Sequence, residues 1–142
     1  MEKINKRDLN KNIYISEGNR KLKRNDNSYF LIWSLPSQIT CPYATALCKA
    51  SCYAKKAERI YPQVLPCRQR NLEETHKKSF VADMVQAITY DINLPKNRNK
   101  QAYFRIHEAG DFYNLAYVYK WIEIAEQLPN VIFTAYTKSV KF

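Results

Sequence analysis

Three cysteines, Cys41, Cys48 and Cys52, lie within twelve positions of one another in the segment TCPYATALCKASCYAKK. Their spacing is C-x6-C-x3-C, and fourteen residues separate the last of them from Cys67. Thiolates are soft ligands that select zinc or iron–sulfur clusters. Three thiolates can hold three irons of a 4Fe–4S cluster and leave one iron open, whereas a fourth from Cys67 would close the cluster. The spacing therefore favours an iron–sulfur site in this segment.

Structural zinc is the main alternative, bound by four cysteines or by three cysteines with His76 or His107. The C-x2-C pairs typical of zinc ribbons do not occur in the sequence. Disulfides are disfavoured, because the opening MEKINKRDLNKN has no apolar signal core and cytosolic thiols stay reduced. Inert packing would account for one cysteine more readily than for three in a single loop.

A second group of polar residues lies in the motif RIHEAGD, in which His107, Glu108 and Asp111 are the candidate catalytic residues. They would form the polar floor of a ligand pocket, with His107 as an acid, a base or a ligand. In the alternative interpretation Asp111 caps the following helix and His107 is satisfied by the backbone. Arg105 alternates with His107, so one face of this strand carries polar side chains that need partners.

Four residues are candidates for cofactor binding. Arg105 precedes the acidic motif, and Tyr136 and Lys138 follow the last apolar segment, where they could bind phosphate or carboxylate. Asn71 stands with two arginines, 68 and 70, at an expected helix start, where backbone N–H groups favour anions. The alternative is an ordinary solvated surface for all of them.

The apolar pattern shows which elements must position these residues. Strands alternate with amphipathic helices, which predicts βαβ units and a parallel sheet. Right-handed crossovers place the carboxyl ends of all parallel strands at one rim, so the three groups of polar residues should meet there. The expected strands are 28–36, the beginning of 101–112, and 131–136, and the expected helices are 51–59, 68–94 and 114–128.

The chain of 142 residues has a net charge of +10, which is unevenly distributed. Eight basic residues fall in 1–28 and eight more in 49–78. This distribution predicts a nucleic acid or phosphate-bearing ligand as partner. No segment approaches the roughly 18 apolar residues of a membrane span, so no membrane is expected. We expect a basic polar N-terminal segment, 1–27, followed by a single α/β metal-binding domain, 28–142.

Four motifs together resemble the "gene product 88" family of phages and mobile elements: TCPYATALCKASCYAKKA, RQRNLEET, FRIHEAGDFYN and YKWIEIAEQLPNVIFTAYTKS. The resemblance implies a phage or mobile-element protein in the cytoplasm of a bacterial host. Family members commonly continue with more βα units, so this chain looks shortened at its C-terminus. The expected fold is a partial parallel (β/α) barrel with an N-terminal extension. Its open sheet edge would be covered by a host protein, a homodimer or its own N-terminal segment.

More distantly, the layout is similar to radical S-adenosylmethionine (SAM) proteins, with cysteines after the first strand and an acidic motif after the second. That resemblance implies that Glu108 or Asp111 would receive the amino group of SAM. The superfamily spacing C-x3-C-x2-C is not matched, which weakens the case for SAM while leaving a cluster plausible.

Two functions therefore compete. The first is an iron–sulfur protein, for which the distant resemblance implies radical-SAM-like chemistry on a nucleotide or nucleic acid, with the protein orienting the cofactor. The second is a non-catalytic basic module, braced by zinc or a closed cluster, that binds nucleic acid or a host protein.

Overall fold

The computed structural model describes residues 4–18, 22–37, 40–47 and 52–139. Its strands form one open sheet in the order β1-β2-β3-β4. β1 is antiparallel to β2, and β2, β3 and β4 are parallel. The mixed α/β class is confirmed, while a partial barrel is not. The strands are β1 (Ser16–Glu17), β2 (Ser28–Trp33), β3 (Gln101–Ile106) and β4 (Val131–Ala135).

Side chains of β3 alternate strictly between the two faces of the sheet. Ala102, Phe104 and Ile106 are buried, whereas Tyr103 and Arg105 are only partly covered. This period of two is what a strand with one packed face requires.

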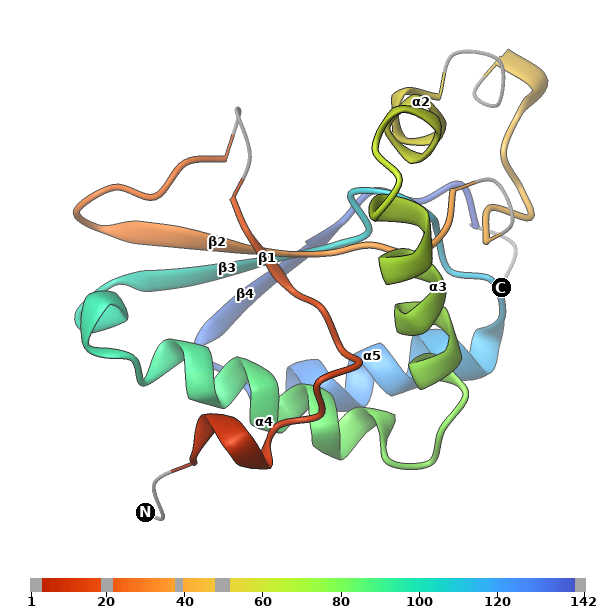
Figure 1. Ribbon diagram of the computed structural model, residues 1–142. Coiled ribbons are helices and arrows are strands. Elements are labelled where there is room, and N and C mark those ends of the chain that lie inside the picture. The colour runs from red at the N-terminus through yellow and green to blue at the C-terminus, as the bar shows by residue number, and fades with distance from the viewer. Residues whose placement is uncertain (1–3, 19–21, 38–39, 48–51, 140–142) are drawn as a thin grey trace.

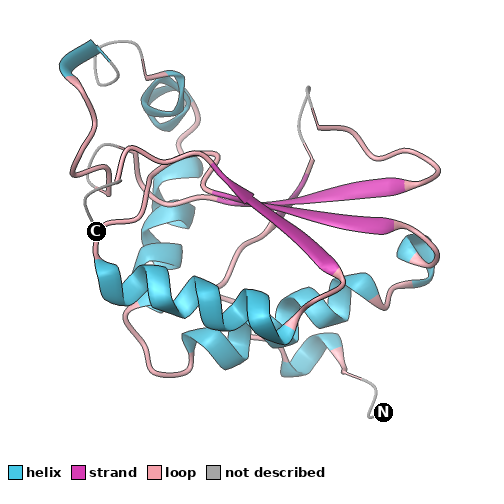
Figure 2. Cartoon of the chain, turned by 180° about the vertical axis from the view of Figure 1, so that it is seen from behind, coloured by secondary structure: helices cyan, strands magenta, loops and turns pink. Residues whose placement is uncertain are grey.

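Two long helices, α4 (Phe80–Ile92) and α5 (Leu115–Gln127), form a layer beneath the packed face (Figure 1). α4 buries Phe80, Met84 and Ile88, which are spaced one turn apart on a single helical face. Asn114 is the N-cap residue of α5, and its side-chain oxygen accepts a hydrogen bond from the amide of Tyr117 at 2.8 Å. Figure 2 shows the twisted strands above this layer from the opposite side.

The single helix expected over 68–94 is wrong, because the structure has two helices there. α3 (Val64–Thr75) ends before α4 starts. Residues 76–79 are all exposed, so the buried face has no apolar residue with which to continue. The amides of His76 and Lys77 turn back to the carbonyls of Glu73 and Glu74, three residues earlier, and tighten the last turn of α3.

The remaining described elements are short. α2 (Tyr53–Ile60) lies close to the helix expected over 51–59. Two 3-10 turns occupy Lys6–Asp8 and Pro95–Asn97. The described N-terminal segment runs past α4 to β1, and its Ile13 and Ile15 pack against the core. None of the described helices is long and apolar enough to cross a bilayer.

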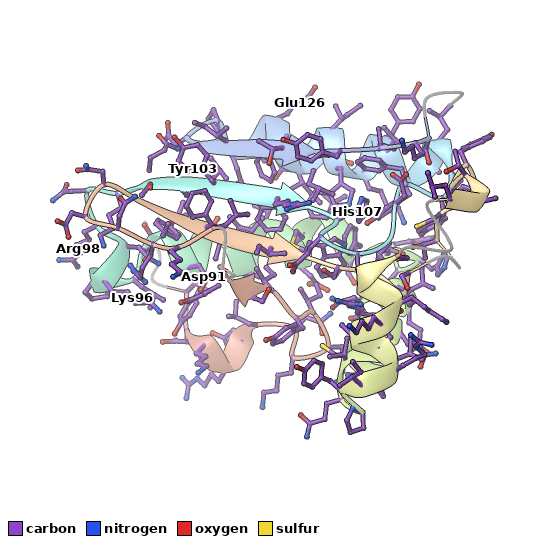
Figure 3. The ribbon with its side chains drawn as sticks, turned by 90° about the horizontal axis from the view of Figure 1, so that it is seen from above. Asp91, Lys96, Arg98, Tyr103, His107 and Glu126 are labelled. Atoms are coloured by element: carbon purple, nitrogen blue, oxygen red, sulfur yellow. The ribbon has the colours of Figure 1, made fainter. Side chains whose placement is uncertain are left out.

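The second face of the sheet carries none of the described helices over β2, β3 and β4 (Figures 1 and 3). α2 and the start of α3 stand beside it, at the carboxyl ends of β2 and β3. We call this surface the open face and define it by Phe30, Tyr103, Arg105 and Ile132. Ile32 points to the same side of the sheet but is only 1% exposed, so the open face ends there. Its relation to α3 determines where a ligand can sit.

Candidate functional site

A pocket of about 410 Å³ lies between α3 and the carboxyl ends of β2 and β3. Three residues predicted for the site, Cys67, Asn71 and Glu108, line it together. Arg68 and Arg70 of α3 line it as well. The crevice at the carboxyl ends of parallel strands is where open α/β sheets bind ligands. We call it the α3 pocket.

Arg68 is held in place by groups from two other segments. Its Nη1 lies 3.5 Å from Oε2 of Glu58 and donates to the carbonyl oxygen of Ala54 at 3.2 Å. Glu58 is itself buried, and its carboxylate accepts from the amide of Ser37 at 2.9 Å and from its hydroxyl at 2.6 Å. The loop after β2, α2 and α3 are thus joined through one buried carboxylate.

Arg70 is exposed and its side chain hydrogen-bonds with Cys67. Burial raises the pKa of the Cys67 thiol, and the positive charges of Arg70 and Arg68 oppose part of that rise. The thiol therefore stays protonated at neutral pH. A protonated thiol is a weak nucleophile, so Cys67 on its own shapes the pocket rather than reacting.

Basic residues dominate the helices beside the pocket. Residues 53–70 contain one acid, Glu58, which is buried and paired. The remaining charges raise the local potential and attract anions. The basic residues of this segment are Lys55, Lys56, Arg59, Arg68 and Arg70.

Asn71 builds the wall of the pocket by bridging two backbone segments. Its side-chain oxygen accepts from the amide of Tyr14 at 2.8 Å, and its Nδ2 donates to the carbonyls of Tyr14 at 3.1 Å and Ser34 at 3.0 Å. These three bonds occupy both donors of the amide. Asn71 thus lines the predicted site while holding the N-terminal segment and the end of β2 against α3.

A sharp turn at the end of β3 separates His107 from Glu108. His107 has a φ of 71°, in the left-handed region, and the amides of both residues donate to the carbonyl of Trp33 at 3.0 Å. Glu108 lines the α3 pocket. His107 is buried instead, with its Nε2 2.8 Å from the hydroxyl of Tyr117.

Burial controls the ionisation of His107. Desolvation lowers its pKa to about 3, so the ring is neutral at physiological pH. Its ring packs edge-on against Phe112 at 4.7 Å between centroids, and Nδ1 has no hydrogen-bond partner among the described residues. The structure places this predicted acid–base residue in the packed interior, away from the pocket lining.

Asp111 is buried and joins three loops. Its carboxylate accepts from the amide of Phe112 at 2.7 Å, the hydroxyl of Thr137 at 2.5 Å and the amide of Lys138 at 2.9 Å. Its own amide donates to the hydroxyl of Thr40 at 3.3 Å. Asn114, rather than Asp111, caps the following helix. Asp111 instead holds together the loops at the carboxyl ends of the strands.

Arg105, Tyr136 and Lys138 lie on or beside the open face. The Arg105 guanidinium sits 5.7 Å from the centroid of the exposed Tyr136 ring, a cation–π contact. In the sheet register Arg105 is opposite Ile32, which lines the α3 pocket. The cofactor-binding residues predicted from the sequence therefore extend sideways from the pocket.

The cysteine loop is described only in part. Cys41 and Cys52 are half-buried at its two ends, and Cys48 lies outside the described residues. Among the residues that are described, no three His, Cys, Asp or Glu side chains gather around one point. The ligand set Cys41, Cys48, Cys52 and Cys67 stays a prediction.

Two features of the site were missed from the sequence. Glu58 is the single carboxylate in a run of basic residues, and that isolation could have marked it as a buried partner. The stacked pair of Phe30 and Tyr103 on the open face follows from the period-two alternation of two neighbouring parallel strands, once their register is known.

Comparisons with known proteins support one assignment. Residues 9–142 match the family described as Gene product 88. The "Gene 88 protein" of Mycobacterium phage L5 is 30% identical over 146 residues, and that of phage D29 is 28% identical. Each alignment covers 97% of this chain and 58% of the relative, so the chain spans a little over half their length. No solved structure matches. These matches do not support a radical-SAM relationship, and the chain belongs to the Gene product 88 family.

Proposed function

We propose that this phage-family protein binds a phosphate-bearing ligand, a nucleotide or the backbone of a nucleic acid, in the α3 pocket. The observation that carries the proposal is the pair of arginines on one wall, Arg68 and Arg70, at the carboxyl ends of parallel strands. Guanidinium groups present planar forks of N–H donors that match phosphate oxygens.

The arrangement of charges suggests the orientation of the ligand. Arg68 is pre-positioned by Glu58, so little side-chain entropy is lost when an anion binds beside it. Glu108 lines the same pocket from the strand side and would repel negative charge there. The ligand should therefore carry its phosphate at the α3 wall and an uncharged part with hydrogen-bond donors, such as a sugar or base, toward Glu108.

Calorimetric titration tests this proposal with two probes, AMP and a 12-nucleotide oligo(dT). Arg70→Ala should weaken both by about tenfold, the magnitude of one hydrogen bond to a charged group. For the oligonucleotide it should also reduce the slope of log K against log salt by about 0.7. Arg59→Ala removes an exposed charge from α2 outside the pocket and is the matched control. Equal effects of the two variants, or binding of neither probe, would contradict the proposal.

We also propose that the cysteine loop binds a metal through Cys41, Cys48 and Cys52. Support comes from the anchored start of the loop, where the hydroxyl of Thr40 donates to the carbonyl of Pro36 at 2.7 Å. Cys52 is the N-cap residue of α2, so it lies where the cysteine loop joins that helix. An iron–sulfur cluster would supply electron transfer, to SAM or another substrate, whereas zinc would brace the loop.

Metal analysis of protein purified without oxygen distinguishes these cases. Iron with sulfide and absorbance near about 400 nm would indicate a cluster, and stoichiometric zinc in colourless protein would indicate the structural role. Cys48→Ser should lose the metal in either case. Cys67→Ser should retain it unless Cys67 completes the site. Metal-free wild-type protein would remove this proposal and leave the α3 pocket unaffected.

A further inference from the structure

The open face of the sheet carries aromatic rings where a packed domain would carry a second layer. Phe30 and Tyr103 are opposite each other in the register of β2 and β3, and their rings stack with centroids 5.3 Å apart and planes at 25°. Figure 3 looks onto this face and places Tyr103 on β3. Ile132, next to Tyr103 on β4, is 44% exposed, and Tyr136 is 80% exposed.

We propose that this open face is a stacking platform for single-stranded nucleic acid whose phosphates enter the α3 pocket, an inference that rests on the proposed function. Aromatic side chains displayed on a sheet stack unpaired bases with little sequence preference. Phe30 and Tyr103 supply two such rings side by side, and Tyr136, directly after β4, supplies a third against the Arg105 guanidinium.

The platform is continuous with the α3 pocket. Two residues along from the Phe30–Tyr103 pair, Ile32 of β2 is opposite Arg105 of β3. Ile32 lines the α3 pocket. Two residues of strand span about 6.6 Å, and this is the distance along β2 from the aromatic pair to the pocket wall. A strand of nucleic acid lying along β2 and β3 would meet rings first and arginines next.

Arg105 fits a role on this platform. Its Nε is buried and has no hydrogen-bond partner among the described residues, and its guanidinium contacts the ring of Tyr136. A polar atom in that state costs free energy unless a ligand completes its hydrogen bond. Guanidinium planes also stack on bases, so Arg105 can contribute by contact and by charge.

Positive charge borders the aromatic pair at its other end as well. A second pocket of about 330 Å³ is lined by Phe30 together with Lys23, Arg24 and one acid, Glu17. Both cations are exposed, and Arg24 also donates to the side-chain oxygen of Asn97 at 2.8 Å. The rings thus lie between two basic regions, the arrangement expected for a groove that tracks a phosphate backbone.

Charge complementarity favours nucleic acid over the other occupants of an uncovered face. A second copy would bring together two chains of net charge +10 each, and their repulsion opposes association. A protein partner would need apolar contact, but it would not need basic residues at both ends of the aromatic pair. Duplex ends present few unpaired bases, so a single strand should bind better than a duplex.

The test compares 12-nucleotide oligo(dT), the matching duplex and AMP on variants of the open face, by mobility shift and calorimetry. Tyr103→Leu keeps an apolar side chain but removes the ring, and should weaken the single strand five- to hundredfold. Tyr136→Ala changes a side chain that is 80% exposed and should weaken it in the same direction without a folding penalty. AMP binding should not change in either variant. Tyr119→Leu on the exposed side of α5 is the matched control.

The outcomes separate this inference from the proposed function. Unchanged oligonucleotide binding in both tyrosine variants, with AMP binding still weakened in Arg70→Ala, would overturn the platform and keep the pocket. Arg70→Ala without effect on either probe would overturn the pocket itself. Duplex binding as tight as single-strand binding would overturn the platform. So would a dimer, measured by sedimentation, that dissociates in Tyr103→Leu, because the face would then be an interface between copies.

Discussion

The Asn71 side chain makes backbone hydrogen bonds of the kind that a neighbouring strand would make. Its amide pairs with both backbone groups of Tyr14 and also holds Ser34, so one residue of α3 closes the wall of the pocket. An amide that is fully bonded and almost completely buried has few acceptable substitutes.

Asn71→Ala should destabilise the protein by about 2–3 kcal/mol, because it removes three hydrogen bonds at once and leaves partly buried backbone groups of two segments without partners. Urea denaturation of the variant and of Gln69→Ala, an exposed position on the same helix, provides the comparison. A loss below about 0.5 kcal/mol would mean that water satisfies these groups as well as Asn71 does.

His107 should make stability depend on pH. Its pKa is about 3 in the folded protein and about 6.5 when unfolded, so the unfolded state binds the extra proton between these values. The contribution of His107 to the free energy of unfolding is therefore fully present above pH 6.5. It declines as pH falls, by at most about 1.4 kcal/mol per pH unit. Asp91 acts in the opposite direction, since burial raises the pKa of this carboxyl to about 6.

The clean measurement is a difference between two proteins. The free energy of unfolding of wild type minus that of His107→Gln should increase as pH rises from 4 to 6.5, because only wild type carries the His107 contribution. The contribution of Asp91 is the same in both proteins and cancels in the difference. Urea unfolding at several pH values measures this difference. A constant difference would show that His107 is not buried as a neutral ring.

The residue types predicted where the site lies better than they predicted which way the individual side chains point. Glu108, Cys67 and Asn71 line one pocket because parallel strands bring their carboxyl ends to one edge. The left-handed turn at His107 then sends neighbouring side chains to different surroundings. That turn depends on two amides sharing the carbonyl of Trp33, a tertiary contact that no local pattern reveals.

At the scale of elements, α3 positions the site and Glu58 positions α3. The carboxylate joins the loop after β2, through Ser37, to Arg68. The apolar pattern predicted helix in this region but merged α3 with α4, because 68–94 keeps helical spacing across the exposed turn at 76–79. Where one amphipathic helix stops and the next begins depended on what each packs against.

Glu58→Ala should cost about 3 kcal/mol or more, because it strands the largely buried Arg68 charge and two donors of Ser37. It should also increase proteolytic cleavage at residues 34–37, since the amide and hydroxyl of Ser37 lose their acceptor. Thermal unfolding and limited proteolysis measure the two effects. Glu73→Ala, an exposed carboxylate on α3, should change neither.

The part of the chain that the structure describes has a sheet with one packed face and one open face. Alternation of strands and helices predicted the parallel order of β2, β3 and β4, and this was confirmed. β1 pairs antiparallel with β2 through only two residues, which is too short to give a pattern in the sequence. The absence of a second helical layer over the described strands depends on chain topology, so it could not be predicted from periodicity.

Two isoleucines on opposite sides of the sheet measure this asymmetry. Ile124→Ala on α5 removes a fully buried side chain and should cost about 2–5 kcal/mol. Ile132→Ala on the open face should cost less than about 1 kcal/mol, because that side chain is already 44% exposed. Equal losses in urea denaturation would show that something covers the open face in solution.

Both tryptophans, Trp33 and Trp121, belong to the core between sheet and helices, where their rings approach to 6.0 Å. The fluorescence of these tryptophans should therefore change when the protein unfolds. It should not change when a ligand binds to the open face. Tyr103→Trp would place an indole fluorophore on the open face, which has no tryptophan among its described residues. Quenching of that probe by added oligonucleotide would give binding curves on an unlabelled protein.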